Sequence, residues 1–458
     1  MGVIQSYGDR DAGSLAVKYG GALPRYTSYP TAPHFTDSVN PATYRDWLAA
    51  IPDGMSLSLY LHVPFCREMC WYCGCFTKVV NRYDPVARYV DLLLREIDMV
   101  ADALAREQPV GFVHWGGGSP TIMTPQDWSR TITRLHARFD IADDAEIAIE
   151  VDPRTATGDY VRALCDLGVN RVSIGVQEFD GDIQRAINRI QPFDVTERTV
   201  AWLRRAGIGN INLDLMYGLP KQSVAHVERM THKALTLRPQ RIALFGYAHV
   251  PWMKTHQRLI NEQDLPGVEA RYEQAARAAH ILVAAGYVRV GFDHFALPGD
   301  VMAGGVEEGV TRNFQGYTTD ASAALIGLGA SAIGALPQGY AQNASSLQSY
   351  RAMIEEGQFA TVRGVALKDE DRLRRHVIER IMCDLCVDLA DACRRFGMPP
   401  DALDGAFGKM VGLIEDGLVH VDGYTVRVEE GARPLVRNVA ACFDAYFGGG
   451  RGRHSSGV

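Results

Sequence analysis

Residues 65–75 read Phe65-Cys66-Arg67-Glu68-Met69-Cys70-Trp71-Tyr72-Cys73-Gly74-Cys75 and follow directly on a strand-like run. Cys66, Cys70 and Cys73 are spaced as CxxxCxxC, which places three thiols on one short loop. Three thiolates can hold three irons of a 4Fe-4S cluster, and no fourth cysteine of the same spaced kind closes the site as in ferredoxins. One iron would therefore stay open to a small chelating ligand.

Two plainer interpretations of these cysteines are packing in the core and a zinc site. Zinc sites usually add a second pair of ligands further along the chain. Cys383 and Cys386 do form a CxxC, but they fall in the apolar run 377–389, for which we predict a helix and core packing. Packed, isolated thiols are expected at Cys165, Cys393 and Cys442.

The composition is that of a large globular enzyme. The chain has 458 residues, of which 47% are hydrophobic and 22% are charged, enough for a large core and a second, smaller domain. Its nine cysteines show no framework spacing, and no secretory or transmembrane stretch opens the chain, so we expect a cytoplasmic protein. The net charge of -7 argues against a nucleic-acid or membrane partner.

From residue 57 to about residue 295 the chain alternates between β-rich runs and helical patterns. Alternation of this kind predicts parallel strands joined by right-handed crossovers, and hence an α/β fold with a partial (β/α)6, TIM-like barrel. The predicted strands are 57–63, 110–115, 146–151, 171–176, 211–216 and 241–247, with a seventh candidate at 287–292. The predicted helices between them include 85–106, 125–139, 196–206 and 268–285.

Polar or glycine residues follow each predicted strand. In a parallel barrel the carboxyl ends of the strands share the face where catalytic groups gather, so these residues are expected to lie together. After the cysteine loop come Gly116-Gly117-Gly118-Ser119, Glu150 and Asp152, Gln177 and Glu178, Asp214, and Ala248 and His249. The three glycines either form a plain turn or bring the backbone close to a ligand.

The cysteine spacing resembles the signature of the radical S-adenosylmethionine (SAM) superfamily, in which SAM chelates the open iron. Further motifs make the chain similar, over nearly its whole length, to the oxygen-independent coproporphyrinogen III oxidases, also called coproporphyrinogen dehydrogenases. These motifs are 24–32 (PRYTSYPTA), 114–118 (HWGGG), 150–154 (EVDPR), 175–177 (GVQ), 188–189 (NR), 214–220 (DLMYGLP), 247–249 (YAH), 293–296 (DHFA), 312–318 (RNFQGYT) and 331–333 (SAI).

The resemblance implies roles for individual residues. Cys66, Cys70 and Cys73 would bind the 4Fe-4S cluster, whereas Cys75 matches a family cysteine that is not a ligand. SAM contacts are implied for Tyr60, Tyr72, Gly117, Gly118, Ser119, Glu150, Gln177, Arg189, Asp214 and Ala248. Two SAM molecules per chain are expected, and Gln315 and Ile333 match positions that contact the second. Ser119 stands where threonine is expected and keeps the hydroxyl.

The implied reaction is the oxidative decarboxylation of two propionates of coproporphyrinogen III to vinyl groups, which gives protoporphyrinogen IX in anaerobic haem biosynthesis. It needs an external one-electron donor such as a flavodoxin-type protein, and a monomer is expected. Arg25, Arg154 and Arg312 are candidates to bind the propionates, each with a structural ion pair as the plainer alternative. Two rival functions stay open: a haem chaperone of the same superfamily, and a radical SAM enzyme for another tetrapyrrole.

We predict three segments: an N-terminal arm at 1–50, the radical SAM barrel with its extension at 51–366, and a mostly helical C-terminal domain at 367–458. The last combines helices with a hairpin formed by 417–421 and 424–428, an arrangement that resembles a winged helix. Its mixed charge favours a lid or packing role over DNA binding. We expect Arg372, Arg374 and Arg375 to lie on a solvated helix face.

Overall fold

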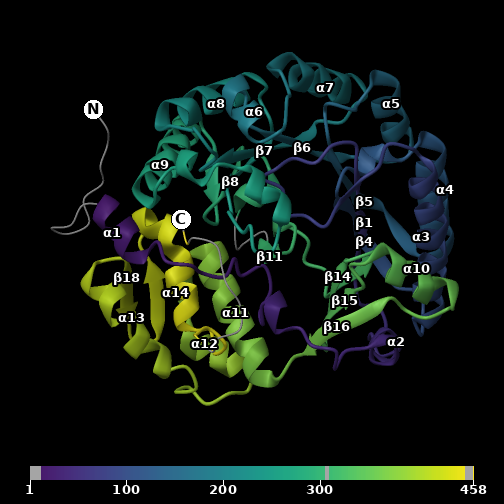
Figure 1. Ribbon diagram of the computed structural model, residues 1–458. Coiled ribbons are helices and arrows are strands. Elements are labelled where there is room, and N and C mark those ends of the chain that lie inside the picture. Colours follow the sequence, from purple (N-terminus) through teal and green to yellow (C-terminus); the bar gives the residue numbers. More distant parts are fainter. Residues whose placement is uncertain (1–11, 305–308, 449–456, 458) are drawn as a thin grey trace.

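The computed structural model describes residues 12–304, 309–448 and 457 of the chain. A 12-stranded sheet, ordered β16-β15-β14-β13-β1-β4-β5-β6-β7-β8-β10-β9, curves through the larger part of the molecule (Figure 1). Its six central strands run parallel. They are β1 (Leu57–Val63), β4 (Pro109–Gly117), β5 (Asp140–Val151), β6 (Arg171–Gln177), β7 (Asn210–Tyr217) and β8 (Arg241–Gly246). The predicted partial barrel is therefore confirmed.

Antiparallel strands extend this parallel core at both edges. The seventh predicted strand is β9 (Val288–Val290), which pairs antiparallel with β10 (His294–Ala296) and does not continue the parallel repeat. At the other edge β13 (Ala324–Leu328), which the sequence pattern did not indicate, lies parallel to β1. It leads into β14 (Ile333–Leu336), β15 (Gly339–Asn343) and β16 (Thr361–Ala366).

β1 is buried along nearly its whole length, whereas β6 and β7 alternate between buried and half-buried residues. Amphipathic helices cover the outer face of the sheet (Figure 1). They are α3 (Asp84–Ala103), α4 (Pro125–Arg138), α5 (Gly158–Asp166), α6 (Gly181–Ala186), α7 (Phe193–Arg205), α8 (Val224–Thr236) and α9 (Val268–Ala284). Trp115 of β4 packs against Trp128 of α4 with ring centroids 4.3 Å apart. Such contacts make the outer layer a single hydrophobic core.

A second core belongs to the C-terminal elements. Helices α11 (Asp369–Asp384), α12 (Leu389–Arg395), α13 (Gly405–Glu415) and α14 (Val436–Cys442) surround a three-stranded sheet of β17 (Cys386–Asp388), β19 (Thr425–Val428) and β18 (Val419–Asp422). The N-terminal segment joins this core through Leu15 on α1 (Ala12–Tyr19), and through Leu23, Tyr26 and Tyr29. The arm thus packs beside the C-terminal elements before the chain enters the barrel through α2 (Pro41–Ala49). The three proposed segment boundaries stay predictions.

Two expectations for the C-terminal elements are wrong. The helix that contains Cys383 ends at Asp384, because Leu385 takes a left-handed conformation with φ of 59° and Cys386 opens β17. The two cysteines therefore lie on different elements. The arginine run is not a solvated face either: Arg372 donates to the carbonyls of Leu367 and Pro337, Arg374 donates to the Phe443 carbonyl, and Arg375 lies over the Tyr340 ring.

Glu96 of α3 is a buried carboxylate that ties the helix to the far side of the fold. It accepts hydrogen bonds from the Gly329 backbone N–H (2.6 Å), the Tyr350 hydroxyl of α10 (Leu347–Glu355) (2.7 Å) and the Asn343 amide (2.6 Å). Burial outweighs these donors and raises its pKa to about 7 from an ordinary value of 4.5. Between these two pH values the native chain keeps a proton that the unfolded chain releases.

We therefore expect the free energy of unfolding to fall as pH rises from 5 to 8, by about 2–3 kcal/mol attributable to Glu96. Glu96→Gln carries no titrating proton at this position. The free energy of unfolding of the wild type, relative to that of the variant, should therefore fall by that amount over the same pH range. Urea unfolding at several pH values measures it, with the exposed Glu197→Gln on α7 as the control. A pH-independent difference would contradict the assignment.

Candidate active site

A cavity of about 560 Å³ opens where the parallel strands end. Each of the six strands contributes to its wall at or just beyond its carboxyl end, as the sequence predicted. The contributions run from the cysteine loop after β1 to Gly117, Glu150, Gln177, Asp214 and Ala248. Arg25 and Thr27 of the N-terminal segment also line the cavity, as do residues 312 and 314–316 around β11 (Thr311–Asn313) and β12 (Gly316–Thr318).

Side chains from other loops hold the cysteine loop in place through its backbone carbonyls. Asn188 donates to the Met69 carbonyl (2.8 Å), and Gln257 donates to the Tyr72 carbonyl (2.9 Å). The His256 ring bonds the Cys73 carbonyl at 2.7 Å. In addition the Trp71 N–H donates to the Ile187 carbonyl. A loop without regular structure thus keeps a fixed shape around the three thiols.

The three cysteines of the motif all line the cavity as free thiols. Each sulfur has a donor beside it: the Thr77 hydroxyl lies 3.1 Å from Cys66, an Arg189 Nη lies 3.5 Å from Cys70, and the Cys75 N–H lies 3.4 Å from Cys73. Donors of this kind stabilise thiolates, which are the ligands of iron–sulfur clusters. The donor set therefore fits a cluster.

Within the described residues, no three His, Cys, Asp or Glu side chains gather around a point where a single metal ion would sit. An iron–sulfur cluster does not need such a point, because its thiolate ligands bind several different irons.

The pKa values of two of the thiols are shifted in opposite directions. The pKa of the Cys66 thiol is raised to about 12 by burial, whereas hydrogen bonding with Cys75 lowers the pKa of Cys73 to about 7.

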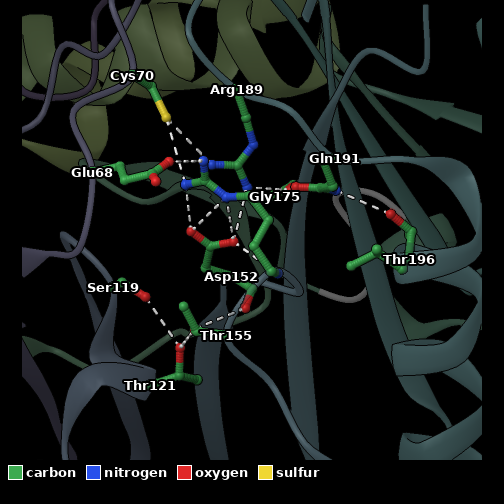
Figure 2. Close-up of polar contacts among 12 residues, drawn as sticks. Glu68, Cys70, Ser119, Thr121, Asp152, Thr155, Gly175, Arg189, Gln191 and Thr196 are labelled. Carbon is green, nitrogen blue, oxygen red and sulfur yellow. Dashed lines mark hydrogen bonds and ion pairs between the residues drawn. The ribbon is translucent and has the colours of Figure 1, made fainter. Parts of the chain in front are cut away.

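Next to Cys70, the guanidinium groups of Arg154 and Arg189 meet the Asp152 carboxylate, and the exposed Glu68 carboxylate lies 3.6 Å from Arg154 (Figure 2). Asp152 accepts from Arg154 at 3.0 Å (Nε to Oδ1) and 2.7 Å (Nη2 to Oδ2), and an Arg189 Nη lies 3.6 Å from its Oδ1. Burial alone would raise the pKa of Asp152, but the two arginines outweigh it and lower that pKa. Both arginines also reach the Cys70 sulfur, at 3.7 and 3.5 Å. The network places positive charge against one corner of the cluster site.

The three glycines have a packing reason that does not depend on a ligand. A Cβ on Gly117, whose φ is +114°, would lie 2.6 Å from the His62 ring, and one on Gly118 would lie 2.6 Å from the Phe65 carbonyl oxygen. Side chains here would push the cysteine loop away from β4. Gly117 and Gly118 nevertheless line the cavity, and the Gly117 N–H donates to Glu150 Oε2 at 3.2 Å.

Two carboxylates lie deeper on the strand ends. Glu150 faces the cavity next to the glycine turn, and Asp214 accepts from the Ser173 hydroxyl (2.9 Å) and the Asn212 amide (2.7 Å). Burial, reinforced by the charge of Glu150, raises the pKa of Asp214 to about 6. The pair gives this wall polar groups able to bind hydroxyl and amino groups of a ligand.

Most of the residues predicted to contact SAM lie in this wall, namely Tyr72, Gly117, Gly118, Glu150, Gln177, Arg189, Asp214, Ala248 and Gln315. Tyr60, Ser119 and Ile333 are not among the lining residues. The Tyr60 hydroxyl bonds His62 Nδ1 at 3.0 Å, and Ser119 is buried with its hydroxyl 3.1 Å from that of Thr121. Ile333 packs in a small apolar cluster with Phe35 and Tyr340. Their contacts with a cofactor stay predictions.

Sequence reasoning missed several residues of the site. Thr77, His256 and Gln257 act on the cysteine loop from elsewhere in the chain, and none belongs to a pattern that spacing could single out. Asp152 was noted only as a polar residue at a strand end. Its pairing with Arg189 depends on the neighbouring positions of β5 and β6 in the sheet, which the parallel topology could have indicated.

Comparison with known proteins agrees with this geometry. A model of the radical SAM superfamily matches residues 60–234. The chain is 51% identical over 446 residues to an oxygen-independent coproporphyrinogen III oxidase of Bradyrhizobium diazoefficiens, covering 97% of this chain and 99% of the relative. It is 43% identical to the corresponding oxidase of Paracoccus denitrificans, over 93% of this chain and 94% of the relative.

A solved structure extends the likeness to the fold. The coproporphyrinogen III oxidase of Escherichia coli, described as a radical SAM enzyme, superimposes with a TM-score of 0.89 at 35% identity, over 95% of this chain and 99% of that chain. These relatives are named as oxidases, which favours the oxidase over the haem chaperone considered from the sequence. The chain belongs to the family of oxygen-independent coproporphyrinogen III oxidases in the radical SAM superfamily.

Proposed function

We propose that the cavity at the strand ends is where this chain carries out the activity of its family. That activity is the oxygen-independent oxidation of coproporphyrinogen III in haem biosynthesis, and family membership gives it to the chain. The finer reaction is part of the proposal: two propionate side chains are decarboxylated to vinyl groups, which yields protoporphyrinogen IX. The observation that carries it is the meeting of the CxxxCxxC thiols with the ends of all six parallel strands in one cavity.

The superfamily brings a 4Fe-4S cluster and SAM as cofactors. In our proposal Cys66, Cys70 and Cys73 hold the cluster, and the loop contacts from Asn188 and Gln257 keep their sulfurs in place. When bound, the cluster and SAM together supply the radical chemistry that removes a hydrogen atom from the substrate.

In this proposal the chain's own residues bind SAM and orient it in the cavity. Glu150, Gln177 and Asp214 offer acceptors and donors to SAM on the strand ends, and Tyr72 adds an aromatic ring from the cysteine loop. Arg189, whose Nη2 donates to the Gly175 carbonyl at 2.6 Å, carries a fixed positive charge beside Cys70. No acid–base pair is required, and exclusion of water from the cavity is left to the N-terminal segment and the residues around β12.

A second SAM molecule per chain is also part of the proposal. Gln315 lines the same cavity, and in our proposal it contacts the second SAM. Its backbone N–H donates to Asn313 Oδ1 at 2.8 Å, so the side chain is held on a short turn between β11 and β12.

We expect Gln315→Ala to keep the cluster and one bound SAM but to lose most turnover, because truncation removes a polar partner far from the cysteines. A loss of about 10-fold or more matches one or two polar contacts. SAM stoichiometry by equilibrium dialysis, alongside porphyrin production, measures both effects. Wild-type turnover with two SAM per chain in the variant would remove Gln315 from the site.

The remaining partners belong to the same proposal. The reaction consumes electrons one at a time at the cluster, so we infer an external one-electron donor such as a flavodoxin-type protein, and a monomeric chain. All nine cysteines are free thiols, which suits a reducing, cytoplasmic location. Within the described residues no helix is long and apolar enough to cross a membrane.

The proposal is tested by SAM cleavage in the anaerobically reconstituted protein with a reductant, with and without coproporphyrinogen III. We expect 5′-deoxyadenosine to form faster when the substrate is present. A substrate of another tetrapyrrole class that stimulates cleavage while coproporphyrinogen III does not would replace the proposed substrate.

A further inference from the structure

Two arginines reach the cavity from opposite ends of the sequence. Arg25 lies on the N-terminal segment between α1 and the barrel, and Arg312 lies on β11. Both line the same cavity as the cysteines and the strand ends. The Arg25 side chain is exposed because it faces this cavity, although protein surrounds it on its other sides.

Arg25 is aimed at the cavity by its neighbours in the chain. Tyr26 is buried in the C-terminal core, takes a left-handed φ of 48°, and donates its hydroxyl to Asp444 at 3.1 Å. The guanidinium itself donates to the Gly246 carbonyl at 2.9 Å, and in the described part of the chain no carboxylate forms an ion pair with it. Burial lowers the pKa of Arg25, which marks a charge that its surroundings do not fully stabilise.

Arg312 is held more tightly and is still short of partners. Its side chain is 4% exposed and lies over the Phe292 and Tyr317 rings, at 4.9 and 4.5 Å from their centroids. Asp293 Oδ1 lies 3.7 Å from its Nη1, too far for a hydrogen bond. Among the described residues neither its Nε nor its Nη1 has a hydrogen-bond partner.

Asp293 is shared between two neighbouring groups in this part of the cavity. Asp293 already bonds the His294 ring at 2.7 Å and faces Arg312, so one carboxylate serves both groups. The guanidinium of Arg25 pairs with no carboxylate of the described residues, so it gains a partner when a ligand brings negative charge.

Arg154 differs from these two residues. From the sequence it is an equal candidate to bind a propionate, but its guanidinium donates hydrogen bonds to the Asp152 carboxylate at 2.7 and 3.0 Å. The structural ion pair is therefore the better account of Arg154, whereas the same account fails for Arg25.

We propose that Arg25 and Arg312 form a carboxylate-binding wall that takes a propionate of the tetrapyrrole substrate. The proposal rests on the proposed function, and it adds which residues recognise the substrate's charge. A guanidinium offers paired N–H donors that match the two oxygens of a carboxylate, so a propionate would give the exposed Arg25 the carboxylate partner that the described residues do not supply, with Arg312 beside it on the cavity wall. Because Arg25 lies on the N-terminal segment, substrate binding at this wall would also depend on that segment.

The test uses coproporphyrin III, the stable and fluorescent oxidised form of the substrate, which keeps all four propionates. Fluorescence titration of the cluster-containing protein gives its Kd for wild type, Arg25→Gln and Arg312→Gln. We expect each variant to bind about 10- to 100-fold more weakly, the range for a lost charge-assisted hydrogen bond. The matched control is Arg205→Gln on the exposed face of α7, which should bind like wild type.

A second probe separates charge from shape. The tetra-amide of coproporphyrin III keeps the ring and loses the carboxylates, so wild type and variants should bind it equally. Because Arg312 is buried, its variant counts only if it keeps the wild-type iron content; otherwise Arg25→Gln alone decides.

Three outcomes then separate the two hypotheses. Binding of coproporphyrin III by Arg25→Gln within about twofold of wild type would overturn the wall and leave the proposed function intact. The same holds if the variants weaken the tetra-amide as much as the acid. If wild type itself neither binds coproporphyrin III nor converts coproporphyrinogen III, the proposed function fails instead.

Discussion

Replacing Cys66, Cys70 or Cys73 by serine is expected to leave the anaerobically reconstituted protein without its cluster and without SAM cleavage. Each of the three cysteines lines the cavity and would be the single protein ligand of one iron, so its replacement removes a ligand that the cluster needs. A serine hydroxyl at neutral pH is a far poorer iron ligand than a thiolate. Iron and sulfide analysis of each purified variant measures the loss.

Cys75→Ser is the matched control for these three variants. Cys75 also faces the cavity, but its contribution to Cys73 comes in part from the backbone N–H, 3.4 Å from the Cys73 sulfur, which serine retains. We expect this variant to keep its iron and sulfide. Full cluster content in any of the first three variants, or its loss in Cys75→Ser, would contradict the ligand assignment.

Asp152→Asn is the second change with a large expected effect. The substitution keeps the shape of the side chain but leaves the guanidinium groups of Arg154 and Arg189 without the carboxylate that they share, whose side chain is 14% exposed. Removing one partner of a buried ion pair costs about 3–5 kcal/mol. We expect that loss in the free energy of unfolding of the cluster-free chain, measured by urea titration.

With the cluster bound the loss should be smaller, because the Cys70 thiolate gives both guanidinium groups another negative partner. Asp194→Asn on α7 provides the control, since Asp194 is 68% exposed and pairs with the exposed Arg198 at 3.5 Å. That change should cost less than about 1 kcal/mol. Equal losses for Asp152→Asn and Asp194→Asn would show that the network next to Cys70 does not stabilise the fold.

The sequence predicts the parallel core well because each strand is a local β-rich run followed by a helical pattern. The predicted strand 57–63 coincides with β1, and the predicted end of the helix at 268–285 lies one residue from that of α9. Sequence patterns failed where the partner lies far away in the chain. β13 is a five-residue run whose place beside β1 is set by long-range pairing, and α11 ends early because of a single left-handed residue, Leu385.

The same distinction holds for the site. The cysteines and the strand-end carboxylates could be found because they follow strands in a regular order. The charges could not be sorted in this way: Arg25, Arg154 and Arg312 look alike in sequence, and only the position of Asp152 and the absence of an ion pair at Arg25 within the described residues separate them. The expectation that Arg374 lies on a solvated helix face was wrong for a similar reason, because its hydrogen-bond acceptor, the Phe443 carbonyl, is distant in the sequence.

The most direct test of the account is turnover of coproporphyrinogen III under strict exclusion of oxygen, with the reconstituted protein, SAM and a one-electron reductant. Products are oxidised to porphyrins, separated by chromatography and weighed by mass spectrometry. We predict a porphyrin in which two propionates have become vinyl groups, formed only when SAM is present and absent with Cys70→Ser. Unchanged coproporphyrin from a protein that holds its full complement of iron and cleaves SAM would contradict the account.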